Sequence, residues 1–472
     1  MSRPRRRAAA PAWLALALSG LIGAAAPGPA HAADADTIAR GKYLAIASDC
    51  TACHTLPGGK PMAGGLPIET PIGAIIATNI TPSKTAGIGD YTLDQFSAAL
   101  RRGVRRDGQL LYPAMPYTAY AKLSDEDVAA LYAYFMNSVE PVDQKPAETK
   151  LPLPFNIRLS MAAWNLLFLD GKPFSSDPSQ SAEWNRGAYL VRGPAHCGTC
   201  HTPRNLLMAE QSSREMAGGD IGFWHAPNVT SDANSGIGGW SVDELVAYMR
   251  DGHASAKAQA GGPMAEAVEN SLRFLTNADL RAIAVYLKSV PAIHDPADTR
   301  PTYLWGNPTD DLAKIRGVPL PGDHDQWSGA QIYDAYCASC HQDKGQGSFD
   351  GRLPSLLHNT ALGTTNTNNV VAVILQGLRR QPDVLMPAFA DALSDQQVAT
   401  LGAYLIENFG NPAAKVTADQ VKAIRAGAAA PNSTLILGAQ IATVAAPLVV
   451  IALLLGWIGR RRSRGESASD MG

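Results

Sequence analysis

The pattern Cys-x-x-Cys-His occurs three times in this chain and uses all of its six cysteines. The copies span Cys50–His54, Cys197–His201 and Cys337–His341. On a helix, positions i, i+3 and i+4 share one face, so two thiols and an imidazole can reach the same planar group. This pattern is the attachment signature of c-type haem, in which both thiols bond to the porphyrin edge and the histidine ligates the iron.

Three copies therefore predict three covalently bound haems c and a chain that carries electrons. The predicted attachment residues are Cys50, Cys53, Cys197, Cys200, Cys337 and Cys340, and the predicted proximal iron ligands are His54, His201 and His341. A Cys-x-x-Cys pair can instead be a redox dithiol, a disulfide or half of a zinc site. A dithiol needs no following histidine, and a zinc ribbon needs its cysteine pairs close together in sequence. These alternatives are therefore disfavoured.

A sixth iron ligand is expected from a methionine in each third of the chain. Methionine opposite histidine raises the haem potential and closes the iron to small ligands. Met115, Met264 and Met386 occupy equivalent positions, each in a loop or turn ahead of a C-terminal helical pattern and beside a proline. Other candidates stay open, namely Met208, Met216, Met249, His225, His253 and His358. His196, which precedes Cys197, is expected at the surface.

Internal repeats indicate three copies of one domain. Arg40–Tyr43, Arg186–Tyr189 and Gly329–Tyr333 each open a helical pattern that leads into a cysteine motif. Each copy ends in a second helical pattern that begins at a Ser or Thr N-cap, with Asp or Gln three residues later as in a capping box. The N-caps are Ser124, Thr276 and Ser394, followed by Asp127, Asp279 and Gln397. This closing segment resembles the last helix of a class I cytochrome c domain, which packs across the first.

The first two copies share a further block, which the third lacks. Asn79–Thr81 followed by Gly87–Thr92 matches Asn228–Thr230 followed by Gly236–Ser241. The glycines indicate close backbone approach, with the haem edge as a candidate neighbour. Arginines follow the amphipathic segments in all copies, at Arg101, Arg102, Arg250, Arg379 and Arg380. Some of them could pair with haem propionates, although a solvated basic face is an equal alternative.

The expected fold is mainly α, with three tandem class I cytochrome c domains and a C-terminal membrane helix. The expected organisation is a signal peptide at 1–32, cytochrome c domains at 33–145, 177–295 and 326–411, a membrane helix at 434–458, and a basic cytoplasmic tail at 459–472. Pro-rich stretches at 141–178 and 291–321 are the expected linkers. A chain of 472 residues is long enough for three such domains.

Both ends of the chain carry targeting signals. Four arginines, an apolar run at 13–26 and the sequence Ala30-His31-Ala32 predict a secretory signal peptide. Without those four arginines the net charge of −2 becomes −6, which gives no reason to expect nucleic-acid binding. The apolar run at 435–458 is long enough to span a bilayer, and the arginines after it predict a cytoplasmic tail. A helix lying on the membrane or packed on a partner is the alternative.

This layout resembles the membrane-bound tri-haem cytochrome c subunits of periplasmic dehydrogenases, which include quinoprotein alcohol dehydrogenase and the flavin-dependent gluconate, sorbitol and fructose dehydrogenases. The resemblance rests on the three haem motifs, the paired Asn-Ile/Val-Thr and Gly-Ile-Gly blocks, and the segment Ala162–Phe168. It implies a catalytic partner that is a quinoprotein, flavoprotein or molybdoprotein, possibly with a small third subunit. It also implies ubiquinone as the acceptor and attachment to the periplasmic side of a bacterial inner membrane.

Catalysis on an organic substrate by this chain alone is not expected. The chain has no Gly-x-G-x-x-Gly motif after a strand and no cysteine outside the haem motifs. Two other functions stay open. One is a haem peroxidase, which needs an iron with an open sixth position. The other is an electron-carrying subunit of a terminal oxidase.

Overall fold

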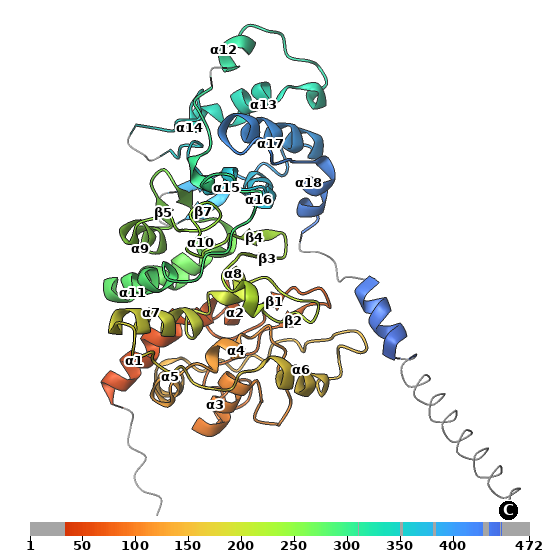
Figure 1. Ribbon diagram of the computed structural model, residues 1–472. Coiled ribbons are helices and arrows are strands. Elements are labelled where there is room, and N and C mark those ends of the chain that lie inside the picture. Colours follow the sequence, from red (N-terminus) through yellow and green to blue (C-terminus); the bar gives the residue numbers. More distant parts are fainter. Residues whose placement is uncertain are drawn as a thin grey trace, which may run out of the picture.

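The computed structural model describes residues 34–309, 311–349, 353–380, 384–427, 434–443 and 445. Within these residues the protein is mainly helical, and its hydrophobic side chains gather in three large clusters that follow one another along the chain. We call the corresponding parts the first, second and third units (Figure 1). The domain bounds given above stay predictions.

The first unit contains α1 (Ala35–Ala47), α2 (Cys50–His54), α3 (Leu93–Arg102), α4 (Tyr117–Tyr120) and α5 (Asp125–Ser138), with the hairpin β1 (Pro67–Ile68) and β2 (Ile75–Ile76). A linking segment holds α6 (Ser160–Phe168). The second unit contains α7 (Ala182–Arg192), α8 (Gly198–His201), α9 (Val242–Asp251), α10 (Gly262–Asn270) and α11 (Asn277–Leu287), with the hairpins β3 (Gly219–Ile221)/β4 (Trp224–Ala226) and β5 (His253–Ala254)/β6 (Ala258–Gln259).

The third unit contains α12 (Asp311–Ile315), α13 (Gly329–Tyr336), α14 (Ala338–His341), α15 (Thr360–Gly363), α16 (Asn368–Gln376), α17 (Asp395–Phe409) and α18 (Ala418–Arg425). Its hairpin pairs β7 (Leu378–Arg380) with β8 (Val384–Met386). All four hairpins are antiparallel and only two or three residues long per strand. The helices therefore carry the core, and the hairpins shape the loops around it.

In each unit the helix that precedes the cysteine motif (α1, α7 or α13) crosses a later helix (α5, α11 or α17) at a glycine. A Cβ atom on Gly41 of α1 would lie 1.9 Å from the carbonyl oxygen of Ala130 in α5. The same test on Gly187 of α7 gives 1.9 Å to the carbonyl oxygen of Ala282, and on Gly329 of α13 it gives 2.4 Å to Cβ of Tyr404. Only glycine allows so close an approach, which explains its place in each opening motif.

The tyrosines of the two Arg-Gly-x-Tyr motifs reach into each other's units. Tyr43 of α1 donates a 2.6 Å hydrogen bond to Asp279 of α11, and Tyr189 of α7 donates to Asp127 of α5. Each aspartate also binds an arginine of its own unit, since Arg186 lies 2.7 Å from Asp279 and Arg40 pairs with Asp127. The two units are thus joined by a reciprocal pair of Tyr–Asp–Arg contacts, which involves no residue of the third.

This contact replaces the capping box that the sequence suggested for α5 and α11. Ser124 and Thr276 accept the expected hydrogen bonds from the backbone of Asp127 and Asp279, but the aspartate side chains face the partner unit. In the third unit, Ser394 and Gln397 form the complete box. Burial alone would raise the pKa of Asp279, but hydrogen bonds from Arg186 and Tyr43 outweigh it and hold that pKa below its usual value.

The shared Asn-x-Thr blocks fasten the chain that leaves each closing helix. The side-chain oxygen of Asn79 accepts hydrogen bonds from the backbone and hydroxyl of Thr81, and its amide donates to the carbonyl of Val142 at 2.7 Å. Asn228 makes the same set with Thr230 and the carbonyl of Ile293. A Cβ on Gly87 would lie 2.2 Å from the carbonyl oxygen of Thr81. The close approach predicted for these glycines is therefore to this loop itself.

The predicted signal peptide at 1–32 lies outside the described residues. The predicted membrane helix at 434–458 is helical at 434–443 and 445, and its other residues, like the basic tail, also lie outside them. Among the described residues, no helix is both long and apolar enough to cross a membrane. The mainly helical fold is confirmed, and the membrane helix stays a prediction.

Replacing Gly41 by alanine should destabilise the first unit. Alanine favours a helix by about 1 kcal/mol over glycine, but the added methyl must push α1 from α5, and overpacking of this kind costs about 1–3 kcal/mol or more. Thermal unfolding followed by circular dichroism should show a lower midpoint. Gly171→Ala is the matched control, because a Cβ there meets nothing within 4 Å. Equal midpoints for both variants would contradict the crossing.

Replacing Tyr43 by phenylalanine should lower the free energy of unfolding by about 1–2 kcal/mol at pH 7, since a hydrogen bond to a carboxylate is lost. Because the pKa of Asp279 is lowered in the folded state, its contribution is present above about pH 4 and is lost as the pH falls further. Denaturant titrations should therefore show a smaller difference between variant and parent at pH 3. Tyr132→Phe, which loses a bond to the neutral carbonyl of Tyr91, should show no such change.

Candidate haem sites

Each Cys-x-x-Cys-His motif forms a short helical turn, at α2, α8 and α14, shortly after α1, α7 and α13 respectively. None of the six cysteines forms a disulfide. Burial raises the pKa of Cys50, Cys197 and Cys337 to about 12 each. A redox dithiol or a zinc ligand needs a thiolate, which a raised pKa disfavours. In the part of the chain that the structure describes, no three His, Cys, Asp or Glu side chains gather to hold a bare metal ion.

The three motif histidines share one orientation. Nδ1 of His54, His201 and His341 lies 2.6, 2.7 and 2.8 Å from the backbone carbonyl of Thr78, Pro227 and Pro354, respectively. Because a carbonyl only accepts, each Nδ1 must carry the proton, and each Nε2 is left with a free lone pair. Burial also lowers the pKa of all three imidazoles, so they stay neutral. A neutral imidazole fixed through Nδ1 is the form that ligates iron.

These carbonyl acceptors were not identified from the sequence, although a signal was present. Thr78 and Pro227 each directly precede the Asn of the shared Asn-x-Thr block. That block fixes the loop through buried side-chain hydrogen bonds, so it also fixes the carbonyl that faces the histidine. In the third unit Pro354 has the same role without such a block.

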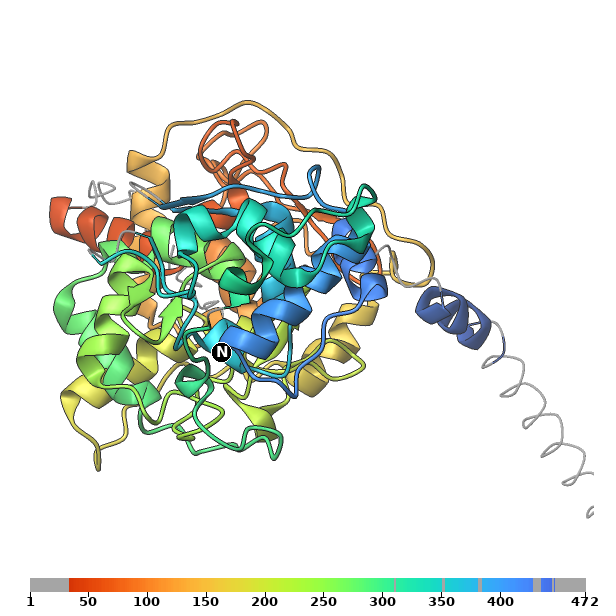
Figure 2. The same ribbon diagram turned by 90° about the horizontal axis from the view of Figure 1, so that it is seen from above.

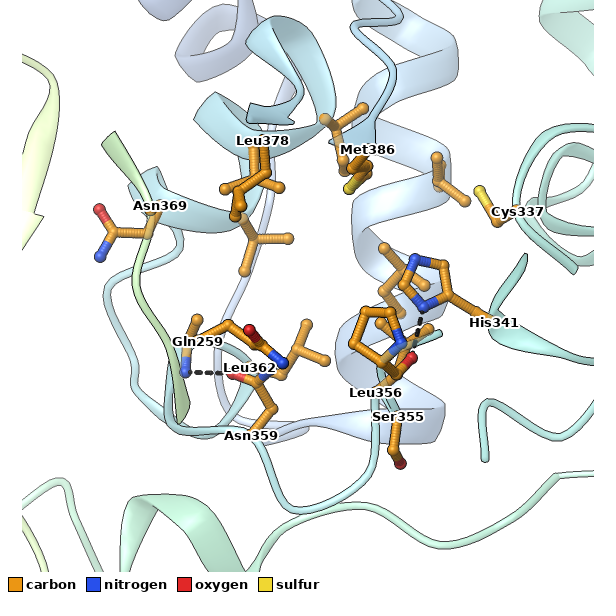
Figure 3. Close-up of a pocket in the computed structure, with 18 of the residues that line it drawn as sticks. Gln259, Cys337, His341, Ser355, Leu356, Asn359, Leu362, Asn369, Leu378 and Met386 are labelled. Carbon is orange, nitrogen blue, oxygen red and sulfur yellow. Dashed lines mark hydrogen bonds between the residues drawn. The ribbon is translucent and has the colours of Figure 1, made fainter. Parts of the chain in front are cut away.

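In the third unit, the predicted haem residues surround one apolar cavity. Cys337, His341 and Met386 line it together, and their side chains point into the same space (Figure 3). Apolar residues of α16 and α17 form much of the remaining wall. Trp224, Gln259 and Gly261 of the second unit also line it, so this cavity lies at the junction of two units. An apolar cavity with a thiol, a neutral imidazole and a thioether on its walls fits a haem c. Cys340 is exposed at the other end of the motif turn.

In the other two units, Met115 and Met264 are half-buried and pack against the core of their own unit. Among the rival methionines, Met208 is exposed, whereas Met216 and Met249 are buried in the second core. Among the rival histidines, Nδ1 of His225 lies 2.7 Å from the carboxylate of Asp220. The assignment of Met115, Met264 and Met386 as iron ligands stays a prediction, as does that of the six cysteines and three histidines.

The arginines proposed for haem propionates differ in their partners. Arg101 is occupied, since it forms a 2.7 Å ion pair with Asp125 and hydrogen bonds to Ser97. Arg250, at the equivalent place in α9, has a buried Nη2 atom without a hydrogen-bond partner among the described residues. A buried guanidinium nitrogen is costly to leave unpaired, so an anionic propionate beside Arg250 fits this site.

The first and second motifs lie close together (Figure 1). Burial raises the pKa of Cys53, and the nearby charges of Asp49, Glu266 and Cys200 raise it further. His196 lies at this junction, where its ring contacts Tyr120 and its Nε2 is 3.3 Å from the carbonyl of Ser48. The expectation that His196 is a surface residue is therefore wrong. It packs against the other unit, because the chain turns there toward the first haem motif.

Comparison with known proteins agrees with these sites. Residues 38–138 match the family model "Cytochrome c", and residues 325–405 match "Cytochrome C oxidase, cbb3-type, subunit III". The fructose dehydrogenase cytochrome subunit of Gluconobacter japonicus is 47% identical over 93% of this chain and 94% of its own length. The chain belongs to the family of dehydrogenase cytochrome c subunits. Its cytochrome c domains imply covalently bound haem c.

Two further members of this family show how widely the match extends. The gluconate 2-dehydrogenase cytochrome c subunit of Pantoea cypripedii is 41% identical, with 87% of this chain and 94% of that relative aligned. The alcohol dehydrogenase (quinone) cytochrome c subunit of Gluconobacter oxydans is 39% identical, with 89% of each chain aligned. The family resemblance inferred from the motifs is thereby confirmed.

Replacing Met386 by alanine should open the iron of the third haem. Without a thioether ligand the haem should become high-spin, bind carbon monoxide when reduced and shift to a lower potential. Optical spectra and a redox titration measure these changes. Leu385→Ala is the control, because Leu385 precedes Met386 in β8 but is 70% exposed. An unchanged spectrum and potential in Met386→Ala would remove Met386 as a ligand.

Proposed function

We propose that this chain carries three haems c and passes electrons from a catalytic dehydrogenase subunit to ubiquinone. The observation that supports it most strongly is the repeated histidine geometry, with three imidazoles held through Nδ1 so that each Nε2 can bind iron. Such residues hold a cofactor, and the haem supplies the one-electron chemistry.

The contacts between units support a continuous path through the haems. The first and second motifs meet where Asp49 and Cys200 lie near each other. Residues of the second unit also form part of the wall of the cavity in the third unit. Asn369 of α16 exchanges two hydrogen bonds with the backbone of His225 in β4, which fixes this second junction. Electron transfer between haems needs such fixed, close spacing, and these contacts would provide it.

The partner is a catalytic dehydrogenase subunit, as in the family. We propose that it oxidises an alcohol, a sugar, a sugar acid or an aldehyde, because the relatives are named for fructose, gluconate and alcohol dehydrogenases. The complex would lie on the periplasmic side of the inner membrane, with the run at 434–458 as its anchor. The predicted signal peptide and the basic residues after the run agree with this orientation.

The terminal-oxidase alternative has one observation in its favour, the match of residues 325–405 to a cbb3-type oxidase subunit model. That match covers a single unit, whereas the dehydrogenase subunits align along nearly the whole chain. The peroxidase alternative needs an open iron position. The cavity in which Met386 faces the same space as His341 disfavours it for the third unit.

The test is gentle purification from native membranes, followed by mass spectrometry and haem counting. A large dehydrogenase should purify with this chain in fixed ratio, and the pyridine haemochrome spectrum should give three haems per chain. Adding fructose, gluconate or ethanol in turn should reduce the haems with one of them, and a ubiquinone analogue should reoxidise them. Co-purifying oxidase subunits, or turnover of peroxide by the chain alone, would contradict the proposal.

A further inference from the structure

Large aliphatic side chains lie exposed along α6, the turn before it and a loop that it contacts. The exposed residues are Ile157, Leu159, Leu166, Leu167, Leu206 and Leu207. We call this set the α6 patch. The indole nitrogen of Trp164 in α6 donates a 2.9 Å hydrogen bond to the carbonyl of Leu207, which ties the loop to the helix. Two segments about forty residues apart thus present leucines together, with Leu166 87% and Leu206 93% exposed.

The α6 helix is apolar on both its inner and its outer face. Trp164 is buried against Tyr117 of the first unit, and Met161 and Phe168 pack around it. The outward residues are Ser160 at the start of the helix and then Ala162, Ala163, Leu166 and Leu167, and the helix has no charged residue. A helix that is apolar all round is normally covered on every side, in a core or by lipid. We therefore expect the outer face of α6 to be covered by lipid or by another protein surface.

Cations outnumber acids around the patch, and the two adjoining acids are paired, Asp170 with Lys122 and Glu210 with Arg204. Residues 151–169 include no acid and a single cation, Arg158, and residues 203–209 include only Arg204. Arg102, whose carbonyl accepts a hydrogen bond from Asn165, and Lys172 flank α6. None of the ion pairs found within the described residues includes Arg102, Arg158 or Lys172. Leucines bordered by unpaired cations are the composition of surfaces that enter anionic lipid.

We propose that the α6 patch inserts into the surface of an anionic membrane. The described helical residues 434–443, which lead into the apolar C-terminal run, lie on the same side of the molecule as α6 (Figures 1 and 2). The chain would then contact the membrane at two places, the α6 patch and the C-terminal run. Two contacts would fix the orientation of the first unit, whereas a single anchor would leave it free to rotate. The loop that carries Met115 lies directly beneath α6, because Tyr117 binds both Asn165 and the carbonyl of Met115.

The test is a spin label at Leu166. All six native cysteines belong to the haem motifs, so Leu166→Cys adds the one thiol that a nitroxide reagent can modify. The labelled full-length complex is measured in detergent and then in vesicles of phosphatidylethanolamine and phosphatidylglycerol. In vesicles, the ratio of oxygen collisions to collisions with a water-soluble nickel complex should be severalfold higher at residue 166 than at a label exposed to water. Leu320→Cys, at a leucine 54% exposed in a distant linker, is the matched control and should not change.

Two results would overturn the proposal. A label at residue 166 that stays open to the nickel complex, while the protein sediments with the vesicles, would show that the membrane does not cover α6. A label with slow motion and low access to both the nickel complex and oxygen, in detergent and in vesicles alike, would assign the patch to a contact with the catalytic subunit or the C-terminal segment.

Discussion

The crossing at a glycine of the helix before the cysteine motif and the closing helix (α5, α11 or α17) is the constraint on which the rest of each unit depends. At Gly41 and Gly187 the helix backbones touch, with no room for even one methyl group. The residue one position before the glycine is then placed to bind an aspartate of its own closing helix. The tyrosine two positions after it faces the neighbouring unit. One short motif thus closes a unit and also joins it to the next.

The haem sites follow from this arrangement. The cysteine motif begins three residues after α1 ends and five after α7 ends, so the crossing determines where each motif turn starts. A hydrogen-bonded loop then brings a carbonyl to Nδ1 of the motif histidine, which orients the ring for its proposed role as an iron ligand. The first and second motifs are held together by the reciprocal tyrosines, and the third is held against the second by Asn369. Electron transfer depends on these fixed relations between units, because outer-sphere transfer requires the haems to stay close.

The α6 patch differs in composition from the protein as a whole. The charge balance of the whole sequence is acidic once the signal is removed, yet the α6 patch is aliphatic and more cations than acids lie at its border. A surface of this kind and a haem loop share the residue Tyr117, which is fully buried between them. The packing of α6 would therefore link the proposed membrane contact of the subunit to the loop that carries Met115.

The sequence by itself determined the cofactor, the repeat and the family, because covalent haem attachment needs cysteines and a histidine at fixed local spacing. It also indicated the closing helices through their N-caps, and the tight glycine loops. Only the tertiary structure decided what the side chains of Asp127 and Asp279 bind, that His196 lies between two units, and that Trp224 lines the third cavity. Those contacts join residues tens to hundreds of positions apart, and no local pattern encodes them. The haem motifs can be identified from the order of residues, because their chemistry depends on local spacing. The contacts between units depend on surfaces that exist only after each unit has folded.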